Sequence, residues 1–273
     1  MNARTVDDFF QFLNGIHATG SHAPRSYVTA IEKTNEALKR HGVFLSSSEC
    51  IWDVKDRERL KKLHALVKSE QSKGEMGIFK EEPSKSYWSK GFCSAAIRDF
   101  IKYVDVIEQY DDVCCNVRNT TQFSTALEAI ERKICGRDTI RQVRVRVNQY
   151  LFRKMVLDNY QHRCCVTGLS IPEVLRASHI KPWAEDEGSR LDPQNGLCLS
   201  ATFDAAFDKY LISFDEDLRL IFSPALREYY SQDAFKRIFL PYEGKTIERP
   251  KCFLPSQRFL RTHRRICLTV VAP

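Results

Sequence analysis

Four side chains suited to catalysis lie within one short stretch of the sequence, from Arg176 to Phe214. His179 follows a short apolar-leaning run, and Asn195 lies in a polar turn rich in Asp, Pro and Gly. Asp204 and Asp208 come next, four residues apart. On a helix, positions i and i+4 share one face, so these two carboxylates can point into one site. A base, an amide and two carboxylates together indicate a metal-assisted hydrolase.

Hydrolysis of a phosphodiester needs a base that deprotonates water and a divalent cation that neutralises charge on the phosphate. His179 suits the first role because the pKa of histidine lies near neutrality. Asp204 and Asp208 suit the second, because hard cations such as Mg²⁺ take oxygen ligands and keep several waters. Asn195 either orients the imidazole or holds the intervening loop.

Short elements are predicted around these residues. Cys165–Gly168 and Leu175–Ile180 are expected to be extended runs on either side of a turn. A short helix is expected over Thr202–Lys209, followed by a hairpin that pairs Leu211–Phe214 with Leu218–Phe222. A hairpin followed by a helix would bring a strand-borne His179 opposite the face that carries the two aspartates.

Positive charge gathers on a helix predicted over Thr139–His162, in which Asp158 is the only acid. The net charge of the whole chain is +7, which favours a polyanionic partner. The helix either tracks phosphates or presents an ordinary solvated face. The residues that we expect to contact nucleic acid, here and further along, are Arg141, Arg144, Arg153, Lys154, Lys181, Lys209 and Arg264.

Four linked submotifs give this part of the chain a resemblance to a known family. They are CCVTG at Cys164–Gly168, ASHIKPW at Ala177–Trp183, NGLCL at Asn195–Leu199, and the Asp204–Phe214 segment. The string resembles the HNH endonucleases, the ββα-metal nucleases, and is most similar to the branch found in bacterial restriction-type proteins. The likeness extends over roughly residues 139–267.

The resemblance implies roles for individual residues. His179 matches the general base, Asn195 the orienting residue and Asp204 the metal ligand on the helix. Asp208 is either a second ligand or a structural carboxylate. Ser178 stands where many HNH nucleases carry an acidic or histidine ligand. The implied cofactor is Mg²⁺ or another divalent ion such as Mn²⁺ or Ni²⁺, and without C-x-x-C pairs no structural zinc is expected.

The expected fold class is α+β. A mostly helical N-terminal domain over residues 1–112 would serve target recognition, dimerisation or sensing. A linker region over 113–138 would follow, and then an HNH nuclease domain over 139–273. The chain has 273 residues, 43% of them hydrophobic and 28% charged, as is usual in globular proteins. In the N-terminal part, Phe92, Ala96, Phe100 and Val104 form an i, i+4 stripe typical of a core-facing helix.

A cytoplasmic location is expected, without a membrane partner. No apolar run approaches the length of a membrane span, and the N-terminus lacks the pattern of a signal peptide. The ten cysteines fit reduced thiols better than a disulfide framework, and Cys164, Cys165 and Cys198 are expected to pack in the core.

The sequence thus predicts a metal-dependent DNA endonuclease with a role in bacterial restriction or defence. Double-stranded DNA is the expected partner, and a homodimer would let two sites cut the two strands. Two alternatives stay open at this point. One is a catalytically silent HNH scaffold that binds DNA or regulates another protein, and the other is a nuclease that acts on RNA.

Overall fold

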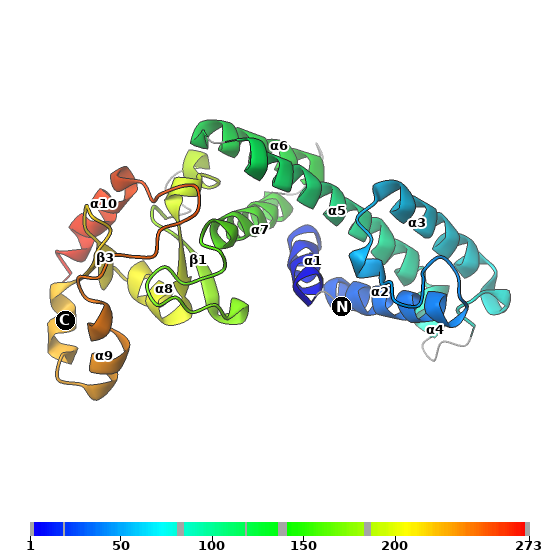
Figure 1. The fold of residues 1–273 in the computed structure, drawn as a ribbon, viewed down its shortest axis with the longest axis horizontal. Coiled ribbons are helices and arrows are strands. Elements are labelled where there is room, and N and C mark those ends of the chain that lie inside the picture. The colour runs from blue at the N-terminus through cyan, green and yellow to red at the C-terminus, as the bar shows by residue number, and fades with distance from the viewer. Residues whose placement is uncertain are drawn as a thin grey trace. The chain divides into compact units, whose positions relative to one another are not determined.

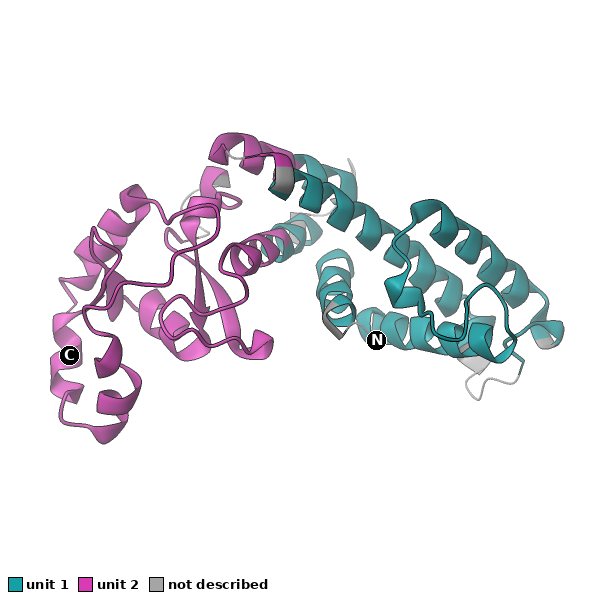
Figure 2. Ribbon diagram, viewed as in Figure 1, with its two compact units in different colours: residues 1–115, 129–150 teal, residues 116–128, 151–273 magenta. Residues whose placement is uncertain are grey.

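The computed structural model of the chain describes residues 3–18, 20–80, 85–117, 119–135, 141–182 and 187–270. It divides into two compact units (Figure 2), one of Met1–Cys115 with Ala129–Tyr150 and one of Asn116–Glu128 with Leu151–Pro273. We call them unit 1 and unit 2. These bounds differ from the predicted 1–112, 113–138 and 139–273, because helices α6 (Thr120–Cys135) and α7 (Arg141–Asn159) each contribute to both units.

The region expected to be a linker, 113–138, is helical over most of its described residues. Helix α5 (Phe92–Asn116) continues into it, and α6 occupies the remainder up to Cys135. Asn119 caps α6, since its Oδ1 accepts hydrogen bonds from the backbone N–H groups of Thr121 and Gln122 at 2.9 and 3.2 Å. The polar composition of this segment therefore reflects a capped surface helix.

Unit 1 is helical (Figure 1). Besides α5, and the parts of α6 and α7 that belong to it, this unit holds α1 (Ala3–Ile16), α2 (Ala23–Arg40), α3 (Arg57–Ser72) and α4 (Lys85–Ser89). Of the predicted stripe on α5, Ala96, Phe100 and Val104 lie in the core, and Phe92 is half-buried. Phe100 packs edge-on against Phe9 with ring centroids 5.3 Å apart. The buried aromatic cluster comprises Phe9, Phe12, Trp52, Phe100 and Tyr103.

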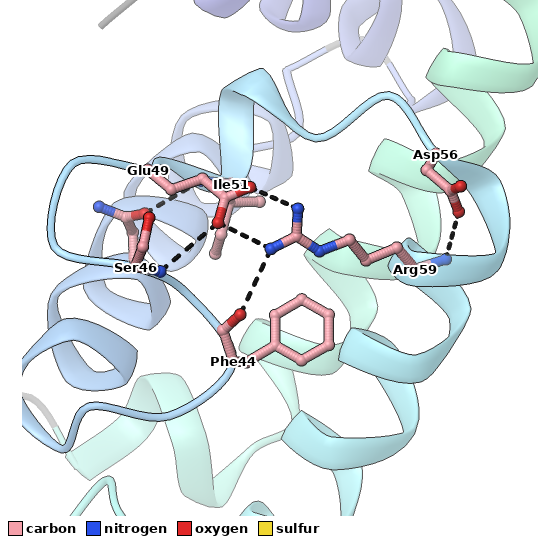
Figure 3. Close-up of polar contacts among 7 residues, drawn as sticks. Phe44, Ser46, Glu49, Ile51, Asp56 and Arg59 are labelled. Atoms are coloured by element: carbon pink, nitrogen blue, oxygen red, sulfur yellow. Dashed lines mark hydrogen bonds and ion pairs between the residues drawn. The ribbon is translucent and has the colours of Figure 1, made fainter.

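The connection between α2 and α3 is fixed by Arg59 (Figure 3). Its guanidinium forms a two-pronged ion pair with Glu49 and reaches the carbonyl of Phe44 at 3.4 Å. Phe44 has a φ of 69°, a left-handed conformation that a non-glycine residue adopts at a cost. Asp56 caps α3 by accepting the N–H of Arg59 at 2.6 Å. Arg59 thus holds the strained turn through its side chain, and its backbone N–H takes part in the cap at the start of the helix.

Unit 2 contains a two-stranded sheet followed directly by a helix. Strand β1 (Leu175–His179) pairs antiparallel with β2 (Gly196–Ser200), with His179 opposite Gly196. Helix α8 (Ala201–Asp208) starts at the residue after β2 and contacts both strands. The predicted helix is therefore confirmed to within a residue at each end, and the predicted strand from Leu175 is confirmed as far as His179.

The rest of unit 2 surrounds this ββα element. The predicted hairpin is present as β3 (Ile212–Phe214) and β4 (Leu220–Phe222), and α10 (Gln257–Cys267) packs on β3. Helix α9 (Asp233–Ile238) lies between β4 and α10 in the sequence. Short 3₁₀ turns complete the chain: η1 (Ile51–Asp53), η2 (Gly74–Met76), η3 (Pro172–Val174), η4 (Glu187–Ser189), η5 (Pro193–Asn195), η6 (Pro224–Tyr229) and η7 (Leu240–Tyr242). The fold class is α+β, as predicted.

The extended run predicted over Cys165–Gly168 is wrong, because this segment forms a tight turn. The backbone N–H of Gly168 donates to the carbonyl of Cys164 at 2.8 Å, and the N–H of Cys164 donates to the carbonyl of Leu169 at 2.8 Å. Gly168 has a φ of +71°, which reverses the chain there. In this turn Cys164 and Cys165 are buried, whereas Val166 is partly exposed and Leu169 is exposed.

Within the described residues, no helix is both long and apolar enough to cross a lipid bilayer.

Candidate active site in the ββα element

The end of β1 carries the residues that the sequence singled out. The hydroxyl of Ser178 donates a hydrogen bond to the Asp204 carboxylate on α8. Neighbouring residues of a strand point to opposite faces, so His179 leaves the strand on the other side. There its ring stacks on Phe152 of α7, with centroids 3.5 Å apart and planes 11° from parallel. The two side chains flank the end of β1.

The environment of His179 keeps its imidazole neutral at pH 7. Its Nε2 lies 3.3 Å from the carbonyl oxygen of Arg190. A carbonyl can only accept, so Nε2 carries the proton and Nδ1 carries the lone pair of the neutral ring. Burial lowers the pKa of His179 to about 4, the Arg190 carbonyl raises it, and the Arg190 charge lowers it. A histidine in this state can accept a proton through Nδ1.

Gly196 and Phe152 support His179, and neither residue was predicted to belong to the site. A Cβ on Gly196 would lie 2.3 Å from Cγ2 of Val156 and 3.1 Å from Cζ of Phe152. Strand β2 therefore comes close to α7 at Gly196, where no side chain stands between them. This close approach allows the Phe152 ring of α7 to stack on His179. The glycine of the NGLCL motif was a usable signal for a close backbone approach. For Phe152 the sequence carried no signal beyond an apolar helix face.

Asn195 is fully buried and holds the two ends of the loop between β1 and β2 together. Its Oδ1 accepts the backbone N–H of Lys181 at 2.8 Å. Its Nδ2 donates to the carbonyls of Ser189 at 3.1 Å and Lys181 at 3.3 Å. The backbone N–H of Ile180 also donates to the Asn195 carbonyl at 3.0 Å. These contacts are of the loop-holding kind, and they fix the backbone directly after His179.

Asp204 and Asp208 lie on α8 as its spacing predicted. Asp204 is partly exposed and is tied to β1 through Ser178, whereas Asp208 is exposed at the end of the helix. Desolvation raises the pKa of Asp208, the negative charge of Asp204 raises it further, and Lys209 lowers it. Two carboxylates that repel each other at the edge of a site offer hard oxygen donors to a cation.

These donors fit a divalent ion that is held largely by water and substrate. Among the residues that the structure describes, no group of three or more His, Cys, Asp or Glu side chains is arranged to hold a metal ion. Mg²⁺ is commonly bound through one or two carboxylates, with waters and substrate phosphates completing its shell. The Asp204–Asp208 pair suits this type of site better than a closed protein cage.

The cysteines near the site are core residues. Cys164, Cys165 and Cys198 have at most 1% of their surface exposed, as expected for small buried side chains. Burial raises the pKa of Cys198 to about 12 and that of Cys165 well above its usual value. A zinc ligand must be a thiolate, and burial of this kind disfavours that form.

Several cations expected to contact nucleic acid have partners within the fold. Arg153 donates to the carbonyls of Leu175 at 2.9 Å and Pro172 at 3.2 Å, which fixes the start of β1. Arg264 is buried; it donates to the carbonyl of Phe214 at 3.0 Å and pairs with Glu216. These bonds give both residues a structural role, and phosphate contact by them stays a prediction.

The remaining cations of that set differ in their surroundings. Arg144 forms an ion pair with Glu131 at 2.9 Å, and Lys154 forms one with Asp158 at 3.3 Å. Lys209 is exposed beside Asp208, and Lys181 is partly exposed in the wall of a cavity. Arg141 is the first residue of α7, and its side chain lies outside the described part of the structure, as does Trp183 of the ASHIKPW motif.

A buried histidine, His263, joins α10 to the ββα element. Its ring stacks on Phe207 of α8 with centroids 3.8 Å apart. Its Nε2 lies 3.1 Å from the Phe207 carbonyl, and its Nδ1 lies 3.0 Å from the hydroxyl of Ser213 on β3. Burial lowers the pKa of His263 to about 4, although the bond to Phe207 opposes this shift.

We expect His263 to make the stability of unit 2 sensitive to acid. Its folded pKa of about 4 lies below the unfolded value of 6.5, so the unfolded state binds the proton more tightly. Its contribution is complete above pH 6.5 and is lost as the pH falls towards 4. Between pH 7 and pH 5 this amounts to on the order of 2 kcal/mol. Denaturant unfolding at several pH values measures it.

His263→Gln should lower stability at pH 7 but flatten its decline between pH 6.5 and 5. Gln at the exposed His41 is the matched control and should leave the decline unchanged. An equally steep decline in wild type and His263→Gln would show that another group is responsible.

The geometry of the site and the comparison with known proteins together indicate the class of protein to which this segment belongs. The paired strands β1 and β2 and helix α8 form a ββα element, with a histidine at the end of the first strand and a carboxylate on the helix. A family model described as HNH endonuclease matches residues 164–215, which include the Cys164 turn, β1, β2, α8 and β3. Residues 164–215 are therefore an HNH endonuclease domain, and the predicted resemblance to this family is confirmed over that segment.

The match does not extend to the finer assignment to a restriction-type branch. A comparison of the chain with curated proteins found no match.

Proposed function

We propose that this protein is a metal-dependent DNA endonuclease that hydrolyses phosphodiester bonds at the end of β1. One observation carries the proposal: within the matched segment, the residue before His179 binds the Asp204 carboxylate of α8. The proposed base and the partner of the candidate metal ligand are therefore consecutive residues at the end of β1. A phosphate bound there would have His179 on one side and the α8 carboxylates on the other.

In the proposed reaction, Nδ1 of His179 accepts a proton from the water that attacks the phosphorus. The Nε2–H bond to Arg190 and the stacking on Phe152 hold the ring in one orientation and one tautomer. Asn195 acts indirectly, because it fixes the backbone of Lys181 and hence the end of the strand. A base held in this way loses little freedom when the substrate binds.

Asp204, with Asp208 one turn further on, would hold the divalent cation. When bound, such an ion neutralises charge on the phosphate and on the leaving oxygen. We propose Mg²⁺ or Mn²⁺ before Ni²⁺, because both donors are hard oxygens.

We propose double-stranded DNA as the substrate, cut one strand at a time. A homodimer would supply the second site, and the helical unit 1 would recognise the target, dimerise or sense a partner. A role in bacterial restriction or defence in the cytoplasm fits this set of activities. Support for the substrate class comes from the net charge of +7 and from the HNH match.

A substrate panel tests the proposal. Supercoiled plasmid, linear duplex, single-stranded DNA and RNA are incubated with Mg²⁺, Mn²⁺, Ni²⁺ or EDTA. We expect conversion of supercoiled to nicked plasmid with a divalent ion and no conversion in EDTA. Cleavage of RNA alone would move the assignment to a ribonuclease, and no cleavage of any substrate would favour a silent scaffold.

Asp204→Asn should raise the metal concentration needed for half-maximal nicking by at least about tenfold, since an amide binds a hard cation more weakly than a carboxylate. Titration of the nicking rate against Mg²⁺ measures this effect. Asp208→Asn separates a second ligand from a structural carboxylate, because only a ligand shifts the titration. Asp233→Asn, on the exposed start of α9, is the control. An unchanged titration in Asp204→Asn would remove Asp204 from the metal site.

A further inference from the structure

A cavity of about 190 Å³ lies directly beyond His179 in unit 2. Its wall combines aromatic, aliphatic and cationic side chains from three parts of the chain. Ile180 and Lys181 follow β1, Tyr210 follows α8, and Arg258 and Phe259 lie at the start of α10. A cavity of about 150 Å³ accommodates benzene, so this one has room for a single six-membered ring.

The cavity is coupled to the candidate active site through the backbone. Lys181 lies two residues after His179, and its N–H and carbonyl both bond to the side chain of Asn195. His263, which is held by Phe207 and Ser213, also contributes to the wall. The wall of the cavity is therefore held in two places. The buried side chain of Asn195 fixes Lys181, two residues after the proposed base, and the buried ring of His263 is fixed by Phe207 and Ser213.

Positive charge continues along α10 from Arg258, which lines the cavity. Arg258, Arg261 and Arg265 are exposed, and their i, i+3, i+7 spacing puts them on one face of the helix. Arg264, predicted from the sequence to contact nucleic acid, is buried instead. The exposed arginines form a track suited to a phosphate backbone, and this track starts at the residue that lines the cavity.

We infer that this cavity binds one nucleotide of the substrate strand beside the scissile phosphate, with its base inside and its phosphate at Arg258. The aromatic walls supply stacking surfaces for an unstacked base, which is how proteins commonly grip single nucleotides. The volume favours a pyrimidine over a purine. This inference rests on the proposed nuclease function, because it assigns part of the substrate to the region next to the same site.

The first test uses dTMP as the probe and measures binding to the full-length protein by saturation-transfer NMR and calorimetry. We expect dTMP to bind more tightly than thymidine, inorganic phosphate or dGMP. Arg258→Gln should weaken dTMP binding about tenfold, the usual loss of one charge-assisted hydrogen bond. Arg237→Gln removes the same charge from exposed α9 and should change nothing. Thr262→Trp, at an exposed position of the wall, should block the cavity.

The second test uses cleavage of a duplex in which a single abasic residue is moved along the strand. At one position near the cut, loss of the base should raise KM for the wild type but not for Thr262→Trp. Active enzyme that does not bind dTMP would overturn the nucleotide site and leave the nuclease assignment standing. Binding of dTMP by a protein that cuts nothing would keep the site and refute the nuclease. Phosphate binding as tight as that of dTMP would reduce the site to an anion contact.

Discussion

His179→Ala should lower the rate of plasmid nicking by about 10²–10⁴-fold, the usual contribution of a positioned general base. The argument rests on the state of the ring. Burial keeps the imidazole neutral, and its bond to the Arg190 carbonyl leaves the lone pair on Nδ1. Alanine removes the proton acceptor, while the backbone of Ile180 and Lys181 remains held by Asn195. Single-turnover nicking of supercoiled plasmid in Mg²⁺ measures the loss.

Two controls separate a lost base from a damaged fold. The unfolding midpoint of His179→Ala at pH 7 should stay near that of the wild type, apart from the packing lost against Phe152. His41→Ala, at an exposed position, should nick at the wild-type rate. Full retained cleavage in His179→Ala, with the protein folded, would sink the assignment of His179 as the base.

The ββα element could be predicted from sequence because its signals are local. The strand from Leu175, the helix that carries Asp204 and Asp208, and the hairpin after it each follow from a short periodic pattern. The order of these elements then fixes which of them meet. The extended run predicted over Cys165–Gly168 is wrong, because a positive φ at Gly168 reverses the chain in a tight turn.

Contacts between segments far apart in sequence could not be predicted in the same way. The stacking of Phe152 on His179 joins α7 to β1 across 27 residues, a separation that leaves no period in the sequence. Arg153 and Arg264 appeared as surface charge, whereas the structure uses their guanidinium groups to satisfy backbone carbonyls. The sequence shows how many charged side chains a segment has, but the packing of the fold decides whether each side chain points to solvent or into the protein.

Contacts between distant segments also explain why the boundaries of the two units differ from the predicted ones. The polar stretch 113–138 is predicted to be a linker region, since polar residues are frequent in connections. Helices α6 and α7 nevertheless contribute to both units, so the boundary falls within helices where composition does not change. A boundary of this kind is defined by which side chains pack together, and the sequence does not record that directly.

Gly196→Ala should destabilise unit 2 by about 3 kcal/mol, at the upper end of the usual cost of overpacking. The added Cβ would lie 2.3 Å from Cγ2 of Val156, a branched side chain with little rotamer freedom, and 3.1 Å from the Phe152 ring. Either α7 or β2 must shift to relieve this contact. Because Phe152 also stacks on His179, we expect nicking to fall together with stability. Denaturant unfolding and nicking, each measured at pH 7, report the two effects.

A double-mutant cycle with Val156→Ala distinguishes this steric cause from a general intolerance of β2 to substitution. Val156→Ala alone leaves a small cavity and costs roughly 1–3 kcal/mol. Combined with Gly196→Ala, it removes the atom that clashes, so the double variant should be more stable than the sum of the single losses by 1 kcal/mol or more, on the order of usual coupling energies between neighbours. Recovery of nicking in the double variant would show that the glycine acts through the position of Phe152. Additive losses would mean instead that the contact with Val156 is not what makes alanine unfavourable at this position, since the extended backbone of Gly196 itself accepts any residue.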